Sequence, residues 1–598
     1  MSSEQPSWKR FSRLRFSKKS LNTQVQKLEK GTMRHAHRFV TTRLDRLSGV
    51  KRQISGWILL VTLLVVVSAT QWWVFRGAYT ETTYANGGTY SEGVLGPLET
   101  LNPLFARSSA EKSAARLLFA SLYHYDATGH LKGDLAESIA TNEAETEYTV
   151  TLKKGLQWSN GTELNAEDVL FTINLLKNPD ARTEFSGWQS INVTLVDAHT
   201  IKFVLSSPYA PFAHSLTFPI LPKHMLNEVP ASSLREHTYS RSPSVTSGPF
   251  ALRLLQDGTS DGTKKIVHMV ANPHYHGGVA KLERFQLYVY PNKDEIAKGL
   301  RTNEIIATPE LTYAAQPDQL KRMYTSSSYG INNGVYALFN SQSPILSSHA
   351  VRQALAYSIN TAELRSKLAQ SNQSLDGPIL ASLIDGQLPA ASSHDIEKAK
   401  SLLDQDGWVV TGNTRTKEGQ KLTLSIVTRK GTEYEQVTNL LAKTWKDTLK
   451  IDTEVRIVDQ TDTAQNVFSS VLQPRNFDVL VYELELGGDP DVYTYWHSSH
   501  ATTRGLNFAN YSNVIADDAL ESARGRATAK QRADRYKIFV QRWHADTPAL
   551  ALYQPKIDYI QLKSARTIDP DTTLVYPTDR YANVIYWAIQ RQQVYKTP

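Results

Sequence analysis

The pattern of apolar and polar positions predicts one long apolar segment near the N-terminus, followed by many shorter strands and helices. The segment SGWILLVTLLVVVSATQWWVF, Ser55 to Phe75, contains no charged residue, and its tryptophans lie towards its two ends. A helix of this length crosses a hydrocarbon core of about 30 Å, and tryptophan suits the interfaces on either side. We therefore predict a transmembrane helix over residues 54–76.

The region that follows shows the two periodicities of strands and helices. In EYTVTLKKGLQWS, the side chains of Tyr148, Val150 and Leu152 alternate with polar ones, which predicts a half-buried strand. In LNAEDVLFTINLLKNP, Asn165 and the acidic residue three positions later resemble a capping box ahead of an apolar helical face. This spacing predicts a helix that ends before Pro179.

The C-terminal half repeats the alternation of strands and helices. The stretches KLTLSIVT, DTEVRIV and FDVLVYEL predict strands, and EQVTNLLAKTWKDTL predicts a helix between the first two. Helices are also predicted in VRQALAYSIN and in DIEKAKSLLDQDGW, where Gly407 suits the left-handed residue that follows a helix. Strand, helix and strand at these lengths indicate right-handed crossovers, so we predict an α/β fold with a mainly parallel sheet.

The charge is unevenly distributed along the chain. With 598 residues the protein exceeds a single core, and two or three domains are expected. The net charge of +8 divides into +11 for residues 1–52, with 14 Lys+Arg against 3 Asp+Glu, and −3 for the remainder, with 52 against 55. The basic excess lies in a tail and not in a patch on a folded domain, so we expect no nucleic-acid partner.

The basic tail also sets the expected orientation. Positive charge stays on the cytoplasmic side, so residues 1–53 are expected to be cytoplasmic and everything after Arg76 exported, with 77–88 as a short linker. The alternative is a cleaved signal peptide, since Val67 to Ala69 offers small residues near a cleavage point. The long leading segment and the apolar continuation to Phe75 favour an uncleaved anchor. Because the chain has no cysteine, disulfides, thiolate metal sites and a lipid anchor on cysteine are excluded.

The densest group of reactive side chains is ELELGGDPDVYTYWHSSH, Glu483 to His500. The motifs GxSxG, HExxH and GxxxxGK[ST] are absent from the sequence. His497 and His500 alone do not complete a zinc site, which needs three or four ligands. Glu483 and Glu485 share a face of the predicted strand and permit an acid–base pair, but nothing else indicates sugar chemistry. We therefore expect no catalytic residue, no metal and no cofactor.

Two interpretations of GGDPD stay open. As a structural turn, Asp489 would cap a helix, Pro490 would take its first position and Asp491 would favour the helix dipole. The same geometry would also present backbone N–H groups to a ligand carboxylate or carbonyl. The motif follows a predicted strand, and in open α/β sheets ligands bind beyond the carboxyl ends of strands.

A set of fragments in fixed order resembles the peptide-binding receptors of bacterial ABC importers, solute-binding protein family 5. The resemblance runs from about Gly87 to the C-terminus. Its most specific part is the third fragment, in which Trp158, Gly161, Ala166, Asp168 and Val169 match the family pattern. The fragments are GGTYSEGVLGPLETLNPLF, LLFASLYHYDATGHLKGDLAES, YTVTLKKGLQWSNGTELNAEDVLFTINLL, TSGPF, VRQALAYSIN, AKSLLDQDGW and GGDPDVYTYWHSS.

The resemblance implies a two-lobed periplasmic-binding-protein-like (type II) fold with three domains, whose lobes close on a ligand and then dock on a permease. No covalent chemistry is implied, and a separate ATPase would supply the energy for transport. The implied domains are lobe 1 over 89–118, 216–330 and 555–598, an inserted domain over 119–215, and lobe 2 over 331–554.

The resemblance also implies a ligand site with one departure from the family. Peptide-binding relatives place an aspartate about three residues before the position of Asp489, where it pairs with the ligand's amino group, and this chain has Leu486 there. Glu483 or Glu485 would have to replace it, because a buried ammonium without a partner costs several kcal/mol. The implied ligand-binding residues are Glu92, Gly93, Val94, Glu483, Glu485, Leu486, Gly487, Gly488, Asp489 and Tyr493.

Two functions remain open at this point. The first is a membrane-anchored extracellular receptor that delivers peptides or similar small solutes to an ABC transporter permease and its ATPase. The second is a tethered binding or sensing protein of the same fold without a transport partner, for which the basic cytoplasmic tail would be an interaction segment.

Overall fold

The structure is a computed structural model that describes residues 50–185, 187–258, 263–370, 372–459, 468–525 and 528–595. Residues Tyr84–Arg591 form one compact unit, and the segments up to Thr83 and from Gln592 form another. Most of the predicted basic tail, residues 1–49, lies outside the described residues.

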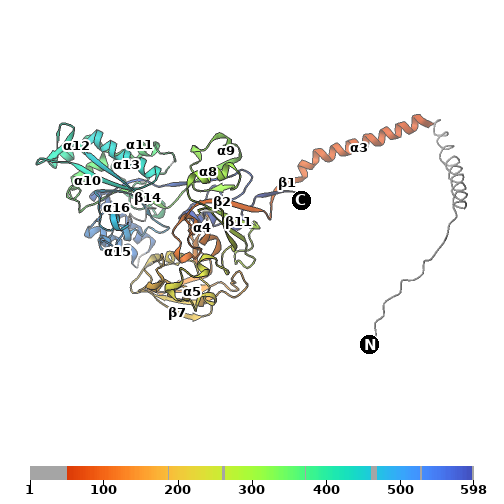
Figure 1. The fold of residues 1–598 in the computed structure, drawn as a ribbon, viewed down its shortest axis with the longest axis horizontal. Coiled ribbons are helices and arrows are strands. Elements are labelled where there is room, and N and C mark those ends of the chain that lie inside the picture. Colours follow the sequence, from red (N-terminus) through yellow and green to blue (C-terminus); the bar gives the residue numbers. More distant parts are fainter. Residues whose placement is uncertain are drawn as a thin grey trace. The chain divides into compact units, whose positions relative to one another are not determined.

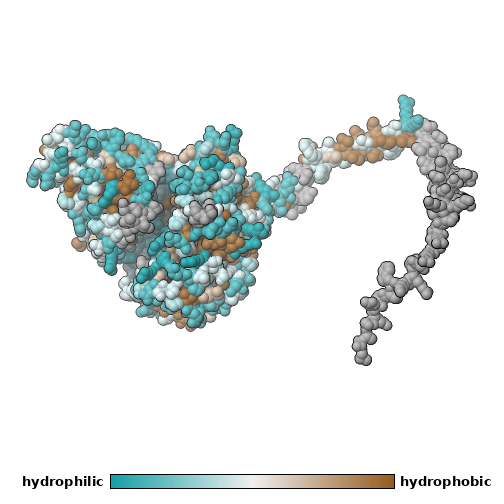
Figure 2. All heavy atoms as spheres, viewed as in Figure 1, coloured by the Kyte–Doolittle hydropathy of each residue, from teal (hydrophilic) through white to brown (hydrophobic). Residues whose placement is uncertain are grey.

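The predicted transmembrane segment is a helix. α3 (Lys51–Tyr79) contains a stretch from Lys51 to Phe75 with a mean hydropathy of 2.1 and none of its residues buried. Its apolar surface is plain in Figure 2. The segment 77–88, predicted as a linker, instead contains the end of α3 and the strand β1 (Thr80–Ala85), which pairs with β23 (Gln590–Tyr595).

The first large sheet, which defines lobe 1, has seven strands in the order β13-β22-β12-β2-β11-β10-β9. Its central pairs, β12 with β2 and β2 with β11, are parallel, and the outer pairs are antiparallel. The five inner residues of β2 are buried, as expected for a strand covered on both faces. The bounds are β2 (Thr89–Leu95), β9 (Phe250–Asp257), β10 (Lys265–Ala271), β11 (Arg284–Tyr290), β12 (Ala307–Thr308), β13 (Tyr324–Gly330) and β22 (Lys556–Leu562).

Three helices pack on lobe 1. α4 (Ser109–Leu118) begins with a capping box formed by Ser108 and Glu111, and it contacts β2, β9 and β11. α8 (Lys293–Arg301) and α9 (Asp318–Met323) cover a small apolar cluster around Tyr290 and Tyr324. These contacts fix α4 against the centre of the sheet.

The inserted region is a four-stranded antiparallel sheet in the order β5-β6-β8-β7, with a hairpin of β3 and β4 beside it. Both predictions made there are confirmed: β6 buries Tyr148, Val150 and Leu152, and α5 begins with a capping box of Asn165 and Asp168. Its core is continuous with that of lobe 1. The bounds are β3 (Tyr123–Tyr125), β4 (Leu131–Gly133), β5 (Ala136–Thr141), β6 (Glu147–Leu152), α5 (Ala166–Lys177), β7 (Asn192–Asp197) and β8 (Thr200–Val204).

The second large sheet, which defines lobe 2, has five strands in the order β19-β18-β20-β14-β21. The predicted parallel arrangement holds for β18 with its neighbours β19 and β20, whereas β14 pairs antiparallel with both β20 and β21. The sheet is therefore mixed, because β14 and β21 come from parts of the chain outside the strand–helix–strand unit. The bounds are β14 (Asn333–Phe339), β18 (Thr423–Arg429), β19 (Asp452–Val458), β20 (Val479–Glu485) and β21 (Ala549–Tyr553).

Helices cover both faces of this second sheet (Figure 1). Alternate residues of β14 enter two different cores: Val335 and Ala337 face one, and Tyr336 and Leu338 face the other. This alternation explains why every residue of the strand is buried. On the first face lie α10 (His349–Tyr357), α11 (Thr361–Ser366), α12 (Ile396–Gln405) and α13 (Thr432–Thr444), and on the second lie α15 (Val514–Arg524) and α16 (Ala529–Asp546).

The chain passes between the two large sheets at two places. The first is between the end of β13 at Gly330 and the start of β14 at Asn333, and the second is between the end of β21 at Tyr553 and the start of β22 at Lys556. Short double connections of this kind allow two lobes to move about a hinge.

Candidate functional site

A cavity of about 910 Å³ lies between the lobes, and residues of both line it. Lobe 1 and the inserted region contribute α4, β3 and the C-terminal segment around Asp579, and lobe 2 contributes the end of β20. The charged and aromatic lining residues are Arg107, Lys112, Arg116, Phe119, Tyr123, His124, Tyr125, Phe185, Glu310, Arg429, Tyr482, Glu483, Glu485, Tyr495, Phe508, Tyr576 and Asp579.

On the wall formed by lobe 2, Glu483 is already fully engaged. Its carboxylate lies 2.7 Å from the Arg429 guanidinium and accepts hydrogen bonds from the Tyr434 hydroxyl and, at 2.7 Å, from the Asn333 amide. Burial and the charge of Glu483 raise the pKa of Tyr434, so that phenol stays protonated as a donor. Glu483 therefore lines the cavity with its negative charge balanced by Arg429 and with both carboxylate oxygens hydrogen-bonded.

Glu485 lies two residues further along β20 and is more accessible. Its side chain is 58% exposed, and its carboxylate lies 3.9 Å from the ammonium of Lys112 on α4. This long ion pair crosses the cleft, since the two residues belong to different lobes. Of the two carboxylates predicted to replace the missing aspartate, Glu485 is thus the one with the weaker existing partner.

The glycine turn after β20 packs directly against the inserted region. Gly487 has φ +70°, a conformation that favours glycine, and a Cβ on Gly488 would lie 2.2 Å from the ring of Tyr125 on β3. The Tyr125 hydroxyl is in turn 2.8 Å from Nδ1 of His214. Burial raises the pKa of Tyr125 and lowers that of His214, so both groups are neutral in this contact. Leu486, just before the turn, is buried and lies outside the cavity lining.

The two aspartates of the turn hold it to both sides of the cleft. Asp489 is 2.7 Å from Arg532 of α16 and 3.9 Å from His214. Asp491 is 2.9 Å from Arg524 of α15 and accepts a hydrogen bond from Tyr209. His214 and Tyr209 belong to the inserted region, so these carboxylates link it to lobe 2.

The predicted helix cap at this turn is wrong. α14 (Tyr493–Trp496) begins four residues after Asp489, and its preceding residue, Val492, provides no side-chain cap. Asp489 instead accepts the N–H of Asp491, and Asp491 accepts the N–H of Tyr493. Asp489 pairs with Arg532 rather than with the helix start, and of the two aspartates it is Asp491 that reaches the first N–H of α14. The Tyr493 ring stacks on His497 and lies under Arg524 rather than lining the cavity.

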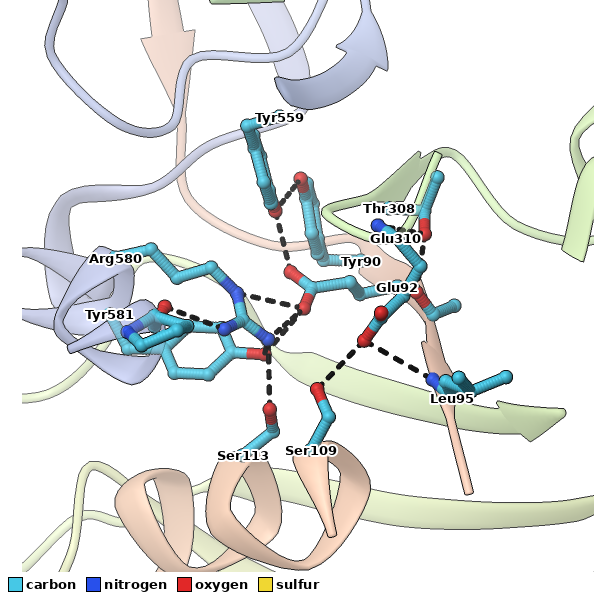
Figure 3. A network of polar contacts seen from close by, with 12 residues as sticks. Tyr90, Glu92, Leu95, Ser109, Ser113, Thr308, Glu310, Tyr559, Arg580 and Tyr581 are labelled. Atoms are coloured by element: carbon cyan, nitrogen blue, oxygen red, sulfur yellow. Dashed lines mark hydrogen bonds and ion pairs between the residues drawn. The ribbon is translucent and has the colours of Figure 1, made fainter. Parts of the chain in front are cut away.

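The segment Glu92 to Val94 lies in the core of lobe 1. Glu92 is completely buried, and its carboxylate accepts hydrogen bonds from Arg580, Tyr559 and Tyr581 (Figure 3). Gly93 is closely packed by Ile305, and Val94 has no exposed surface. The sequence predicts that these three residues face the ligand, and none of them lines this cavity.

The wall opposite β20 contains functional candidates that the sequence reasoning missed. α4 turns Lys112 and Arg116, one turn apart, towards the cavity, and Asp579 lies nearby in the C-terminal segment. Burial raises the pKa of Asp579 to about 6, although the Arg116 charge counteracts this. The spacing of the two cations on a helix directly after β2 was a usable signal, whereas the approach of Asp579 depends on a contact between distant parts of the chain.

His497 and His500, from the stretch Glu483 to His500, belong to no metal cluster among the described residues. Within the described residues, no group of three or more potential ligands has the geometry to hold a metal ion. His497 is buried and lies 3.1 Å from the carboxylate of Glu521.

A two-lobed α/β molecule with a cavity between its lobes is the architecture of solute-binding receptors. Residues 130–505 match the family "Bacterial extracellular solute-binding proteins, family 5 Middle". The oligopeptide-binding protein AppA of Bacillus subtilis (strain 168) is 25% identical over 488 residues, which cover 78% of this chain and 86% of the relative. The chain belongs to this family, whose members are binding receptors and not enzymes.

Solved structures show the same fold. The AppA structure from Bacillus subtilis in complex with a nonapeptide has a TM-score of 0.67 at 23% identity, and the match covers 85% of this chain and all 100% of that one. NikZ from Campylobacter jejuni, in complex with Ni(L-His), has a TM-score of 0.69 at 20% identity and covers 84% of this chain and 99% of its own. Similar folds thus surround ligands of different chemistry.

Proposed function

We propose that the protein is a membrane-anchored receptor that captures peptides or similar small solutes outside the membrane and delivers them to the permease of an ABC transporter. The observation that carries this proposal is the cavity of about 910 Å³ lined by both lobes. Its volume lies in the range typical of ligand sites, and relatives of this chain bind oligopeptides. The apolar helix α3 supports anchoring in the membrane.

We further propose that lobe 2 extends over about residues 331–554, since the chain crosses between the sheets near both of these positions. Ligand would then close the lobes about the two connections. Of the predicted site residues, Glu483 and Glu485 line the cavity, and the turn Gly487 to Asp489 packs the lobes together at its edge.

The test uses the full-length protein, purified from membranes in mild detergent. Mass spectrometry of the solutes that co-purify identifies candidate ligands, which are then added back in thermal-shift measurements. A ligand at 100 times its dissociation constant adds about 2.7 kcal/mol of stability. If no peptide co-purifies and peptide mixtures give no shift, peptide capture is refuted.

A second candidate function is a binding or sensing protein of the same fold without a transport partner. The charge of +11 over residues 1–52 favours it, because such a tail suits a cytoplasmic interaction. Cross-linking in intact cells separates the two: adducts with a permease support delivery, and adducts of the tail alone with a cytoplasmic protein support sensing.

A further inference from the structure

The clearest unused group in the cleft is the guanidinium of Arg116. The side chain is partly buried and lines the cavity, yet among the residues that the structure describes it makes no hydrogen bond and no ion pair. The two other arginines that line the cavity are both occupied, Arg107 by Glu184 at 2.7 Å and Arg429 by Glu483 at 2.7 Å. The N–H donors of the planar Arg116 guanidinium are therefore available to a ligand in the cleft.

The helix that presents Arg116 is held by hydrogen bonds at two points. Near the start of α4, Ser109 donates to Glu310 at 2.7 Å, and one turn later Ser113 accepts a hydrogen bond from Arg580 at 2.8 Å (Figure 3). Arg580 is itself fixed by the buried carboxylate of Glu92. α4 is thus tied to the core of lobe 1 through Ser113, and Lys112 and Arg116, on the same side of the helix, line the cavity beside this bond.

The carboxyl group of Asp579 interacts electrostatically with Arg116 but forms no direct contact with it. Asp579 accepts the backbone N–H of Tyr576 at 2.8 Å, and no ion pair with Arg116 forms within 4 Å among the described residues. Burial raises the pKa of Asp579 to about 6, so its charge is costly in this position. A ligand anion that approaches in a hydrogen-bonding geometry can therefore compete with Asp579 for the guanidinium of Arg116.

The opposite wall lacks a comparable acceptor for a cation. The carboxylate of Glu483 is satisfied by Arg429, Tyr434 and Asn333. Glu485 is more than half exposed, where an ion pair contributes little. The remaining lining carboxylate, Glu310, accepts hydrogen bonds from Ser109 and from the backbone N–H of Leu95. Among the described residues, the charge in the cleft that still lacks a hydrogen-bond or ion-pair partner is therefore the guanidinium of Arg116.

We propose that Arg116, assisted by Lys112 one turn earlier, is the subsite for a carboxylate of the bound solute, and that a free amino group is not required for binding. This inference rests on the proposed solute capture and specifies its ligand class. Carboxylates pair with guanidinium in a bidentate manner, which fixes the direction of the ligand as well as adding affinity.

The test is a competition between peptides that differ only at their ends. An equimolar pool of tri- to penta-alanine peptides, each in free, N-acetylated, C-amidated and doubly blocked form, is incubated with the full-length protein in detergent. The retained peptides are then quantified by mass spectrometry. We expect forms with a free carboxylate to be retained at least tenfold over the amides, and acetylation to change retention less than about threefold.

Variants separate a ligand contact from a merely structural role. Arg116→Gln should abolish the preference for carboxylates, and Arg116→Lys should keep part of it, with unchanged melting temperatures. Arg241→Gln is the matched control, since Arg241 forms an exposed ion pair with Glu236 and does not line the cavity, and it should keep the full preference. Equal retention of acids and amides by the wild-type protein overturns the carboxylate subsite while leaving peptide capture intact.

A second probe distinguishes failure of this inference from failure of peptide capture. If no peptide is retained, peptide capture is refuted, and citrate binding is measured by calorimetry instead. Citrate binding that Arg116→Gln weakens at least tenfold supports the anion subsite for another solute class. Citrate binding that is absent, or equal in the two proteins, overturns the subsite.

Discussion

At the scale of single residues, the best-defined feature of the molecule is the buried pair of Glu92 and Arg580. Both side chains are fully buried, and the carboxylate and guanidinium are 2.7 Å apart. Tyr559 donates to the second carboxylate oxygen at 2.5 Å, so both oxygens of Glu92 are hydrogen-bonded. Burial alone is costly for such charges, and this surrounding network is what makes the pair tolerable.

Glu92→Gln should therefore destabilise lobe 1 strongly. The change leaves the buried guanidinium of Arg580 without its countercharge, and we expect a loss of about 3–5 kcal/mol in the free energy of unfolding. Urea denaturation followed by tryptophan fluorescence measures this loss. Glu283→Gln breaks an exposed pair with Arg284 and should cost less than about 1 kcal/mol. Similar losses for the two variants would contradict the role given to burial.

Asp579→Asn should instead stabilise the protein, and only at neutral pH. The folded-state pKa of Asp579 is about 6, above the value of about 3.9 in an unfolded chain, so its ionisation above that range opposes folding. We expect the variant to be more stable than the wild type by roughly 2–3 kcal/mol above about pH 7, with the gain vanishing below about pH 4. Unfolding midpoints at the two pH values measure it. A gain that is independent of pH would point to packing instead.

At the scale of elements, the turn between β20 and α14 decides how the lobes meet. Its glycines permit close approach, and its aspartates connect arginines of lobe 2 with His214 and Tyr209 of the inserted region. The turn is thus a contact between lobes as well as an edge of the ligand cavity.

Gly488→Ala should weaken this contact. The added Cβ would lie 2.2 Å from the Tyr125 ring, so the turn and β3 must separate, at a cost of about 1–3 kcal/mol in stability. Thermal unfolding measures the cost. In a Tyr125→Ala background the same substitution should cost little, because the clashing ring is gone. Equal costs in both backgrounds would show that the strain arises elsewhere.

The sequence predicted some of these helices and strands and did not predict others. Local patterns predicted β6, α5, α12 and β19, because alternation and capping depend on neighbouring residues. The antiparallel strand β14 and the pairing of β1 with β23 were not predicted, since strand partners far apart in sequence leave no local pattern. In the site, Glu483 and Glu485 were identified at the end of their strand. The burial of Glu92 was not predicted, because its partner Arg580 lies 488 residues away.

At the scale of the whole molecule, the proposed function calls for a tether to the membrane. α3 offers such a tether. Its exposed residues include Leu63 at 59% and Val66 at 53%, surface that water does not favour but a bilayer does. A tether keeps the binding domain close to a permease at high effective concentration.

Our final prediction is that α3 remains uncleaved and is inserted in the membrane. Intact-mass measurement of the protein extracted from membranes should give the chain from its first residue, and a mature N-terminus near Thr70 would establish a signal peptide instead. A lysine at the centre of a membrane helix costs about 2.5–3.5 kcal/mol, so Leu63→Lys combined with Val66→Lys should shift the protein into the soluble fraction. Leu195→Lys combined with Val196→Lys, at two exposed positions of β7, adds the same two charges outside α3 and should leave the protein in the membrane. Membrane retention of the double variant would require an attachment other than α3.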